Sequence, residues 1–275
     1  MTVPHLTAAK LVAARQEGSL SRTLNDIFIM TRRNLLLDFR NPEVIVGATA
    51  FPVSLLLIFT ASFAKVVMPN GNYADYAQFV VPLSIVQGLL FSTVTTGTAL
   101  YNDLESGMDT RLRTLPISRL AILAGRILGS AGRLLAQVII ITFIGYLLGF
   151  RFHHGFLATL LFLFLPIVFA LSFTWMAILS AVKARTAESV EVTMYPWLLP
   201  LTFLSIGYVP KAGFPEWLQG FVELNPISCV TQALRGLSAT SQPIVEPAIK
   251  TLLWSLILTL LFSTLAIRAY QNRSH

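Results

Sequence analysis

The fold is decided by residues 156–182, which read FLATLLFLFLPIVFALSFTWMAILSAV. This stretch holds 27 consecutive residues without an Asp, Glu, Lys or Arg. About 20 mostly apolar residues in a helix are enough to cross the hydrocarbon core of a bilayer. Charged residues make up only 12% of the 275-residue chain, about half the share of a soluble domain. The sequence therefore predicts an all-α, polytopic protein whose solvent is lipid.

Five further stretches are apolar enough to span a bilayer, which makes six in total. The predicted spans cover residues 44–66, 79–101, 127–150, 156–182, 192–209 and 249–269. The third is the least regular, because Arg126 and Arg133 lie near its beginning, and its hydrocarbon part is expected to start at Leu134. We expect Arg133 to snorkel to the inner face. The alternative is a buried charge with a functional role.

Lysine and arginine are unevenly distributed among the segments that connect these spans. Fourteen of the 20 fall in the N-terminal segment, in the connections after spans two and four, and in the tail; five fall in the other connections. Because basic residues accumulate in cytoplasmic loops, both termini are predicted to be cytoplasmic. Residues 1–20 lack the apolar core of a signal peptide and are expected to form a flexible cytoplasmic segment before a transmembrane domain over residues 21–275.

Residues 21–40 are predicted to form a helix lying along the cytoplasmic interface. Apolar residues such as Ile27 and Phe28 recur at helical spacing, and basic residues such as Arg32 and Arg33 fall largely between them. Asn41-Pro42 would break the chain before it enters the bilayer. An ordinary cytoplasmic helix packed on a partner is the alternative.

The longest predicted cytoplasmic connection covers residues 102–126. Its first part, residues 102–118, mixes charges of both signs with one Gly and one Pro, and places Leu112 and Leu115 three residues apart. Such a segment can form a short helix that docks on another protein. A solvated loop that merely connects two spans is the alternative.

Residues 210–250, on the predicted outer side, are too apolar for a water-filled loop and too interrupted by proline for a span. The pattern indicates a re-entrant hairpin before the last span, covered by protein because lipid cannot satisfy its backbone groups. Trp217 suits the outer interface. The residues expected to form this hairpin and close the pathway are Phe214, Pro215, Trp217, Asn225 and Pro226.

Catalytic and energy-coupling signatures are missing from the sequence. It contains no G-x-x-x-x-G-K-[ST], H-E-x-x-H or G-x-S-x-G, and Cys229 is its only cysteine. His153 and His154 are expected to form an ordinary interfacial turn rather than a metal site. The spans are nearly free of ionisable residues, which argues against a proton- or sodium-driven carrier. We therefore expect no catalytic residue, no metal and no cofactor in this chain. The net charge of +7 follows from topology rather than from nucleic-acid binding.

The order of these segments resembles the permease subunit of type-2 ABC exporters, most of all the daunorubicin-resistance-type permeases. The resemblance covers roughly residues 21–269 and depends on the order of the pieces rather than on any single one. The matching residues are Glu105, Gly107, Arg111, Leu115 and Pro116; Gly149, Phe150, Arg151 and Phe152; Gly207, Tyr208, Val209 and Pro210; Phe214, Pro215, Glu216 and Trp217; Asn225, Pro226, Ile227 and Ser228; and Arg235. The short outer segment disfavours members with large outer insertions.

The resemblance implies a second permease copy or paralogue and two ATP-binding subunits, which hold the ATP and magnesium. It makes the segment around residues 107–116 a coupling helix that sits in a groove of the ATPase. The implied coupling residues are Glu105, Gly107, Arg111, Leu112, Arg113, Leu115 and Pro116. The family exports hydrophobic drugs, lipids or lipid-linked glycans across the cytoplasmic membrane.

Export of an amphipathic drug or lipid is therefore the leading hypothesis. A permease for a lipid-linked glycan has the same fold, and an entrance lined by aromatic residues would favour it. A membrane-embedded lipid-modifying enzyme needs intramembrane acidic or histidine residues, which are missing. A structural scaffold without transport is the remaining alternative.

Overall fold

The computed structural model describes residues 20–107, 119–240 and 242–272, and the secondary structure within these ranges is entirely helical. The all-α prediction is confirmed. The elements are α2 (Leu20–Arg40), α3 (Pro42–Val67), α4 (Tyr73–Glu105), α6 (Arg119–Leu147), α7 (Phe156–Lys183), α8 (Ala187–Phe203), the 3₁₀ helix η1 (Lys211–Gly213), α9 (Glu216–Leu224), α10 (Pro226–Ser238) and α11 (Val245–Asn272).

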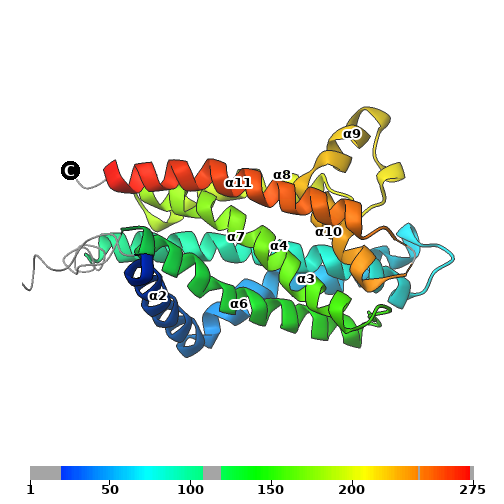
Figure 1. Ribbon diagram of the computed structural model, residues 1–275. Coiled ribbons are helices and arrows are strands. Elements are labelled where there is room, and N and C mark those ends of the chain that lie inside the picture. The colour runs from blue at the N-terminus through cyan, green and yellow to red at the C-terminus, as the bar shows by residue number, and fades with distance from the viewer. Residues whose placement is uncertain (1–19, 108–118, 241, 273–275) are drawn as a thin grey trace, which may run out of the picture.

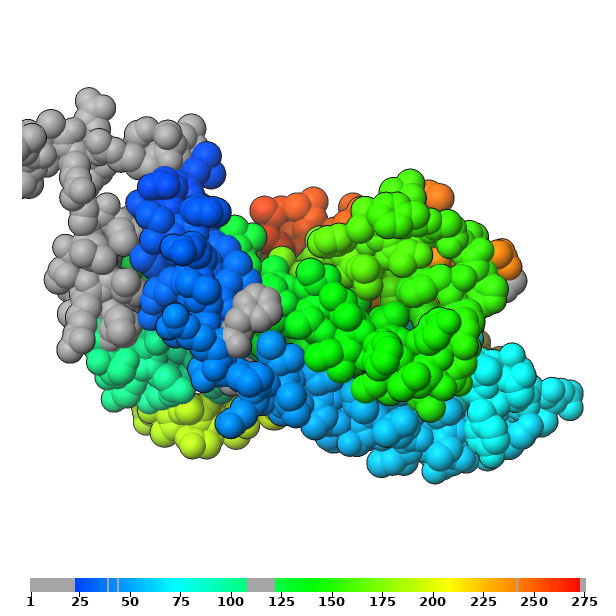
Figure 2. Space-filling model, turned by 90° about the horizontal axis from the view of Figure 1, so that it is seen from below, coloured from blue at the N-terminus to red at the C-terminus, as the bar shows by residue number. Residues whose placement is uncertain are grey.

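The long helices run side by side along one axis, and α2 lies at a steep angle to them at one end of the bundle (Figure 1). We call this the α2 end. The opposite end, which carries α9 and α10, is the hairpin end. The space-filling view also shows α2 at one end of the molecule, with α3 continuing from it along the length (Figure 2). The break between them falls at Asn41-Pro42, as predicted, because Pro42 opens α3.

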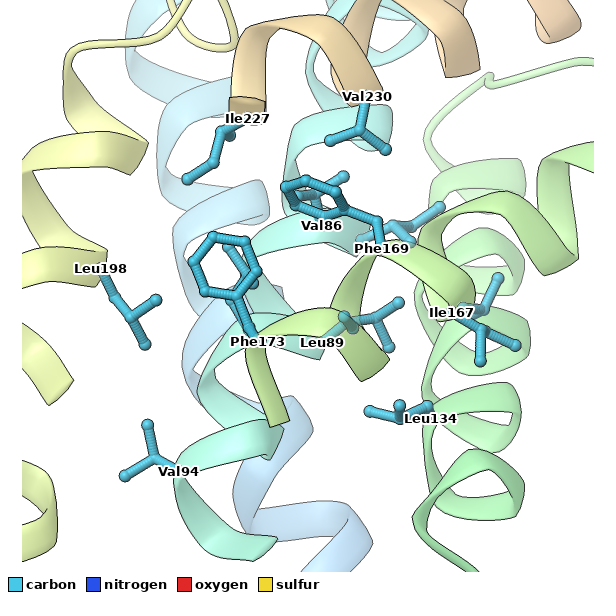
Figure 3. Packing of buried hydrophobic residues seen from close by; sticks show 14 of the residues in the cluster. Val86, Leu89, Val94, Leu134, Ile167, Phe169, Phe173, Leu198, Ile227 and Val230 are labelled. Atoms are coloured by element: carbon cyan, nitrogen blue, oxygen red, sulfur yellow. The ribbon is translucent and has the colours of Figure 1, made fainter. Parts of the chain in front are cut away.

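Helix α4 forms the centre of the bundle. It packs against α3, α6, α7, α8 and α10, and 89% of its most apolar window is buried. Figure 3 shows how Val86 and Leu89 of α4 meet Phe169 and Phe173 of α7. The helix begins with a capping box, in which Asn72 and Asp75 each accept a hydrogen bond from the other's backbone N–H.

The perimeter of the bundle is apolar. Helix α11 shows this most clearly, because only 11% of its most apolar window is buried. The side chains that it leaves at least half exposed include Ile249, Leu252, Leu253, Leu256, Ile257, Leu260 and Leu261. A continuous apolar surface of this length suits hydrocarbon and not water. The protein is therefore a membrane protein, as the composition predicts.

Five helices in the described part of the chain are long and apolar enough to cross a membrane. They are Ile45–Val67, Tyr73–Glu105, Ile122–Leu147, Phe156–Lys183 and Val245–Asn272, which correspond to predicted spans one to four and six. The fifth predicted span, residues 192–209, corresponds to α8 and the segment after it. Helix α8 has 17 residues, about 26 Å at 1.5 Å per residue. The count of six spans stays a prediction.

Candidate functional site: the two ends of the bundle and an aromatic face

Arg133 lies in α6 with its side chain only 4% exposed. Its guanidinium group donates hydrogen bonds to Asp38 Oδ1 of α2 at 3.1 Å, to Ser92 Oγ and the Ser92 carbonyl oxygen of α4 at 3.0 and 3.3 Å, and to Thr96 Oγ1. A buried guanidinium group requires such partners because it has left water. The expectation that Arg133 snorkels is therefore wrong. The side chain points into the bundle and joins α6 to α2 and α4.

A second arginine of α6 joins this helix to α4 closer to their ends. Arg126 forms an ion pair with Asp103, near the end of α4. These two helices flank residues 108–118 of the chain, so the ion pair joins the helices on either side of the predicted coupling segment. Nearby, the Tyr101 hydroxyl donates to the Arg185 carbonyl oxygen at 2.5 Å, which connects α4 to the α7–α8 turn. Three sets of polar contacts therefore join α2, α4, α6 and the α7–α8 turn at the α2 end.

Helices α2 and α6 approach each other closely because glycine lies on the facing side of α6. A Cβ atom on Gly125 would lie 2.3 Å from Met30 Cβ, and one on Gly129 would lie 2.5 Å from Asn34 Cβ. The second contact lies four residues after the first on both helices. The Asp38–Arg133 ion pair lies another four residues along both. Helix α2 therefore follows one ridge of α6.

The predicted coupling residues are only partly within the described residues. Glu105 is the last residue of α4 and is exposed, and Gly107 follows in a left-handed conformation with φ +71°. The others, Arg111, Leu112, Arg113, Leu115 and Pro116, lie outside the described residues. The structure places the start of this segment at the α2 end, next to the Asp103–Arg126 ion pair. The coupling role stays a prediction.

The predicted interfacial residues lie on α2. Residues 21–40 form the predicted helix, with Phe28 and Arg32 exposed and Ile27 and Arg33 half-buried. The side of α2 that packs against α6 instead carries Met30. The structure therefore confirms the helix, and its place at a membrane interface stays a prediction.

At the hairpin end, Asn225 is the joint between α8 and α10. Its side-chain NH₂ group donates to the carbonyl oxygens of Leu201 and Leu204 at 2.7 and 2.8 Å, and its Oδ1 accepts from the Ile227 N–H at 2.8 Å. The same side chain therefore satisfies carbonyls at the end of α8 and caps α10, whose first residue is Pro226.

Arg235 of α10 is buried at this end, with 4% of its surface exposed. It donates to the carbonyl oxygens of Phe79, Ile206 and Gly207 at 2.9, 3.0 and 2.7 Å, and its Cζ lies 3.5 Å from the centre of the Phe79 ring. Within the described residues, no acidic side chain forms an ion pair with it. The planar group thus clamps α10, the start of α4 and the α8–α9 connection together. In the sequence alone, Arg235 is notable only as one of the residues that carry the resemblance to daunorubicin-resistance-type permeases.

The predicted gate residues divide into two groups. Asn225 and Pro226 belong to the buried joint, whereas Phe214 and Pro215 precede α9 and Trp217 stands on its surface, 81% exposed. Helix α9 is held by an ion pair between Lys211 and Glu223 and by the Trp254 indole N–H, which donates to the Leu224 carbonyl oxygen at 3.1 Å. The hydrogen bond from Lys211 lowers the pKa of Glu223. Trp217 is thus at the surface, whereas Asn225 is only 2% exposed.

Aromatic rings lie between α3 and α8, both of which pack against α4. In one cluster, Tyr208 stacks on Phe59 at 4.2 Å and on Phe203 at 5.6 Å between ring centres. In the other, Phe91 of α4 contacts Phe51 at 5.3 Å and Tyr195 at 5.7 Å. Phe51, Phe63 and Phe203 remain 43–50% exposed. We call the seven rings Phe51, Phe59, Phe63, Phe91, Tyr195, Phe203 and Tyr208 the aromatic face.

Metal ligands do not gather in the parts of the chain that the structure describes, where no three His, Cys, Asp or Glu side chains could hold an ion. The rings of His153 and His154 contact the carbonyl oxygens of Ser238 and Ala239 at 3.1 and 3.2 Å instead. These histidines therefore connect the α6–α7 turn to the end of α10.

Comparison with known proteins shows which family this chain belongs to. The sequence pattern of the ABC-2 type transporter family matches residues 25–238, from α2 to the end of α10. The chain belongs to the ABC-2 type transporter family. The matched residues include the whole charge network of the α2 end, the aromatic face and the α8–α10 joint.

Several relatives of this ABC-2 chain carry drug-resistance names. It is 34% identical over 237 residues to the daunorubicin resistance ABC transporter permease protein DrrB1 of Streptomyces coeruleorubidus, covering 85% of this chain and 81% of that protein. It is 28% identical over 232 residues to the probable doxorubicin resistance ABC transporter permease protein DrrC of Mycobacterium tuberculosis, covering 82% and 81%. It is also 28% identical over 277 residues to the permease DrrB of that organism, covering 96% of each chain. The resemblance to daunorubicin-resistance-type permeases is confirmed.

Proposed function

We propose that this chain is the membrane-spanning permease subunit of an ATP-driven exporter, which moves a hydrophobic or amphipathic drug or lipid out across the cytoplasmic membrane. The similarity to daunorubicin and doxorubicin resistance permeases over most of the chain carries the proposal. Because the sequence has no P-loop, ATP and magnesium belong to partner subunits. Two such subunits and a second permease copy or paralogue complete the transporter.

The proposed topology has six spans, α3, α4, α6, α7, α8 and α11, with the α2 end in the cytoplasm. The excess of Lys and Arg in the segments at the α2 end supports this orientation. Helix α8 is short, but the buried residues Ser205, Ile206 and Tyr208 extend its path beyond Phe203. Helix α10, at 13 residues or about 20 Å, is too short to cross, which supports a re-entrant hairpin.

The charge network supports a coupling role for the α2 end. Residues 108–118 connect α4 and α6 directly, and the Asp103–Arg126 ion pair holds these helices together where the segment leaves them. Arg133 extends the connection to α2. A force that the ATPase applies to the segment would therefore move three helices together rather than bend one loop.

The aromatic face is the proposed contact surface for the substrate. Partly exposed rings can stack on a planar lipophilic drug, and such pairs add about 0.5–1.5 kcal/mol beyond area burial. The same rings favour a second candidate, a permease for a lipid-linked glycan, because sugar rings also pack against aromatic faces. The drug-resistance names of the relatives favour the first candidate.

One experiment separates the two candidates. The chain is expressed with the ATP-binding subunit that we expect to be encoded beside it, and hydrolysis by the purified complex is measured with daunorubicin or with a lipid-linked oligosaccharide. We expect the subunits to purify together and daunorubicin to stimulate hydrolysis. The ATP-binding subunit alone is the control. Stimulation by the oligosaccharide only would select the second candidate, and a chain that binds no ATPase would overturn both.

A further inference from the structure

Helix α2 carries two rows of side chains on a face away from its glycine contacts with α6. The first row is Phe28, Arg32, Leu36 and Arg40, and the second is Ile29, Arg33 and Leu37. Residues four apart share one side of a helix, so each set forms a row. Residues three apart are also neighbours on a helix surface, so the two rows run next to each other. Together they line a concave space of about 370 Å³, which we call the α2 groove.

The α2 groove is cationic and apolar at once. Among the residues that the structure describes, it is lined by three arginines and no acidic side chain, and none of these arginines forms an ion pair there. Its apolar members are open to the surroundings, with Phe28 66% and Leu36 45% exposed. Guanidinium groups bind phosphate through paired hydrogen bonds. The groove is therefore complementary to a molecule with a phosphate head and an apolar tail.

The connection to α3 limits how far the groove can lie from the hydrocarbon core of the membrane. Arg40 precedes Ile45, the first residue of the α3 span, by five residues. An extended chain covers at most about 3.6 Å per residue, so Arg40 lies within about 18 Å of the hydrocarbon edge. The lipid head groups begin at that edge. A lipid head group can therefore reach the Arg40 end of the groove without leaving the bilayer.

The order of residues along each row favours a lipid over an acidic protein surface. Protein interfaces keep their apolar anchors in the centre and their charges at the rim. In the α2 groove, Arg32 instead lies between Phe28 and Leu36 in its row, and Arg33 lies between its two apolar neighbours. Alternation of this kind suits head groups and the first methylenes of the chains.

An anion in the groove would also complete the charge balance of the α2 end. Arg33 is close enough to Arg126 for the two cations to repel each other. Arg33, Arg126 and Arg133 face only two acidic partners, Asp38 and Asp103, in the interactions described above. A phosphate beside Arg33 supplies the missing negative charge and favours α2 packed against α6.

We propose that the α2 groove binds the head group of an anionic phospholipid of the cytoplasmic leaflet, and that this lipid stabilises α2 against α6. The choice of leaflet rests on the orientation in the proposed function. Lipid binding itself does not require that the chain exports a drug, so the two ideas fail separately.

Native mass spectrometry of the purified full-length chain tests the proposal with phosphatidylglycerol and phosphatidylcholine of matched acyl chains. Each basic residue near an anionic surface contributes about 1 kcal/mol, or roughly fivefold in affinity. The triple variant Arg32→Gln, Arg33→Gln, Arg40→Gln should therefore bind phosphatidylglycerol about a hundredfold more weakly. The single variant Arg32→Gln, at an exposed position, should lose about fivefold and covers the case in which the triple variant does not fold.

The matched control removes three other cations from the same predicted side, through Lys183→Gln, Arg185→Gln and Arg268→Gln. It should keep the preference for phosphatidylglycerol, and inorganic phosphate should not displace the lipid. Equal binding of both lipids by the wild type would overturn the proposal, as would equal losses in the two triple variants. A groove variant that keeps the lipid but no longer retains the ATP-binding subunit would assign the groove to a protein partner and overturn it as well.

Discussion

The Arg133 network permits a quantitative test of how α2 is joined to the bundle. The changes are Arg133→Leu and Asp38→Asn, made singly and together. Removing one partner of a buried ion pair costs about 3–5 kcal/mol. The lower end applies here, because the Asp38 side chain is 21% exposed. Arg133→Leu also removes the hydrogen bonds to Ser92 and Thr96, so we expect it to cost about 3 kcal/mol.

Asp38→Asn should cost less. Burial raises the pKa of Asp38, and the neighbouring Arg133 opposes that rise. A raised pKa means that folding penalises the ionised carboxylate of Asp38. The neutral amide of the Asp38→Asn variant would avoid this desolvation penalty, although it would also lose the attraction to Arg133. We expect a coupling of about 2 kcal/mol between the two positions. It should shrink as the pH falls through the raised pKa, because protonated Asp38 no longer attracts Arg133.

The assay is the melting temperature of the purified chain in detergent, followed as the monodisperse fraction in size-exclusion chromatography after heating. A chain of this size loses about 2–4 °C per kcal/mol. Arg133→Leu should therefore lower Tm by about 6–12 °C, and the double variant should lose about 4–8 °C less than the sum of the single variants. The exposed Glu246–Lys250 pair of α11 is the control and should show coupling below about 0.5 kcal/mol. Additive losses at Asp38 and Arg133 would mean that Arg133 is solvated, and would refute the network.

Four further outcomes are expected. Reporter fusions at Asn70, His153 and Glu223 should read outside. Fusions at Asp109, Arg185 and the tail after Arg273 should read inside. A cytoplasmic signal at Glu223, in the hairpin, would contradict the topology. Arg235→Lys should lower Tm by several degrees in the same assay, because a lysine cannot bind three carbonyls in one plane. An unchanged Tm would show that Arg235 does not hold these segments together. Leu112→Ala with Leu115→Ala should reduce the ATPase co-purified per permease more than Arg111→Ala does, because apolar anchors dominate interfaces; wild-type recovery would end the coupling assignment. Trp217→Ala should reduce drug transport with ATPase binding intact; loss of the ATPase would show that α9 is no outer gate.

The helices themselves could be predicted from the sequence, because long apolar runs permit little else in a bilayer. Residues 156–182 became α7 almost unchanged, and the break at Asn41-Pro42 falls between α2 and α3. The end of α8 was harder to place. Its Pro196 and Pro200 lie inside the helix, which ends at Phe203, before the predicted span does.

The place of Arg133 could not be predicted, because its partner Asp38 lies 95 residues away in sequence. Without that partner, an arginine near the beginning of a span is expected to reach for water. A sign was nevertheless present in the spacing. Met30, Asn34 and Asp38 of α2 are spaced four residues apart, as are their partners Gly125, Gly129 and Arg133 of α6.

The hairpin end combined a predictable break with an unpredictable contact. Asn225-Pro226 indicated the start of a new helix, and Asn225 does cap α10. Arg235 binds backbone carbonyls of Phe79, Ile206 and Gly207, and no side-chain pattern shows which carbonyls will be left without partners. The aromatic face was hidden for a similar reason, since its rings come from α3, α4, α8 and the segment after α8.

The proposed function requires this chain to move a lipophilic drug only when an ATPase acts on it. The most direct measurement is ATP-dependent accumulation of daunorubicin in inside-out membrane vesicles that contain the chain and its ATP-binding subunit. We predict accumulation with both subunits and ATP, and none with either subunit alone or with a non-hydrolysable nucleotide. Equal accumulation in vesicles that lack the chain would contradict the claim.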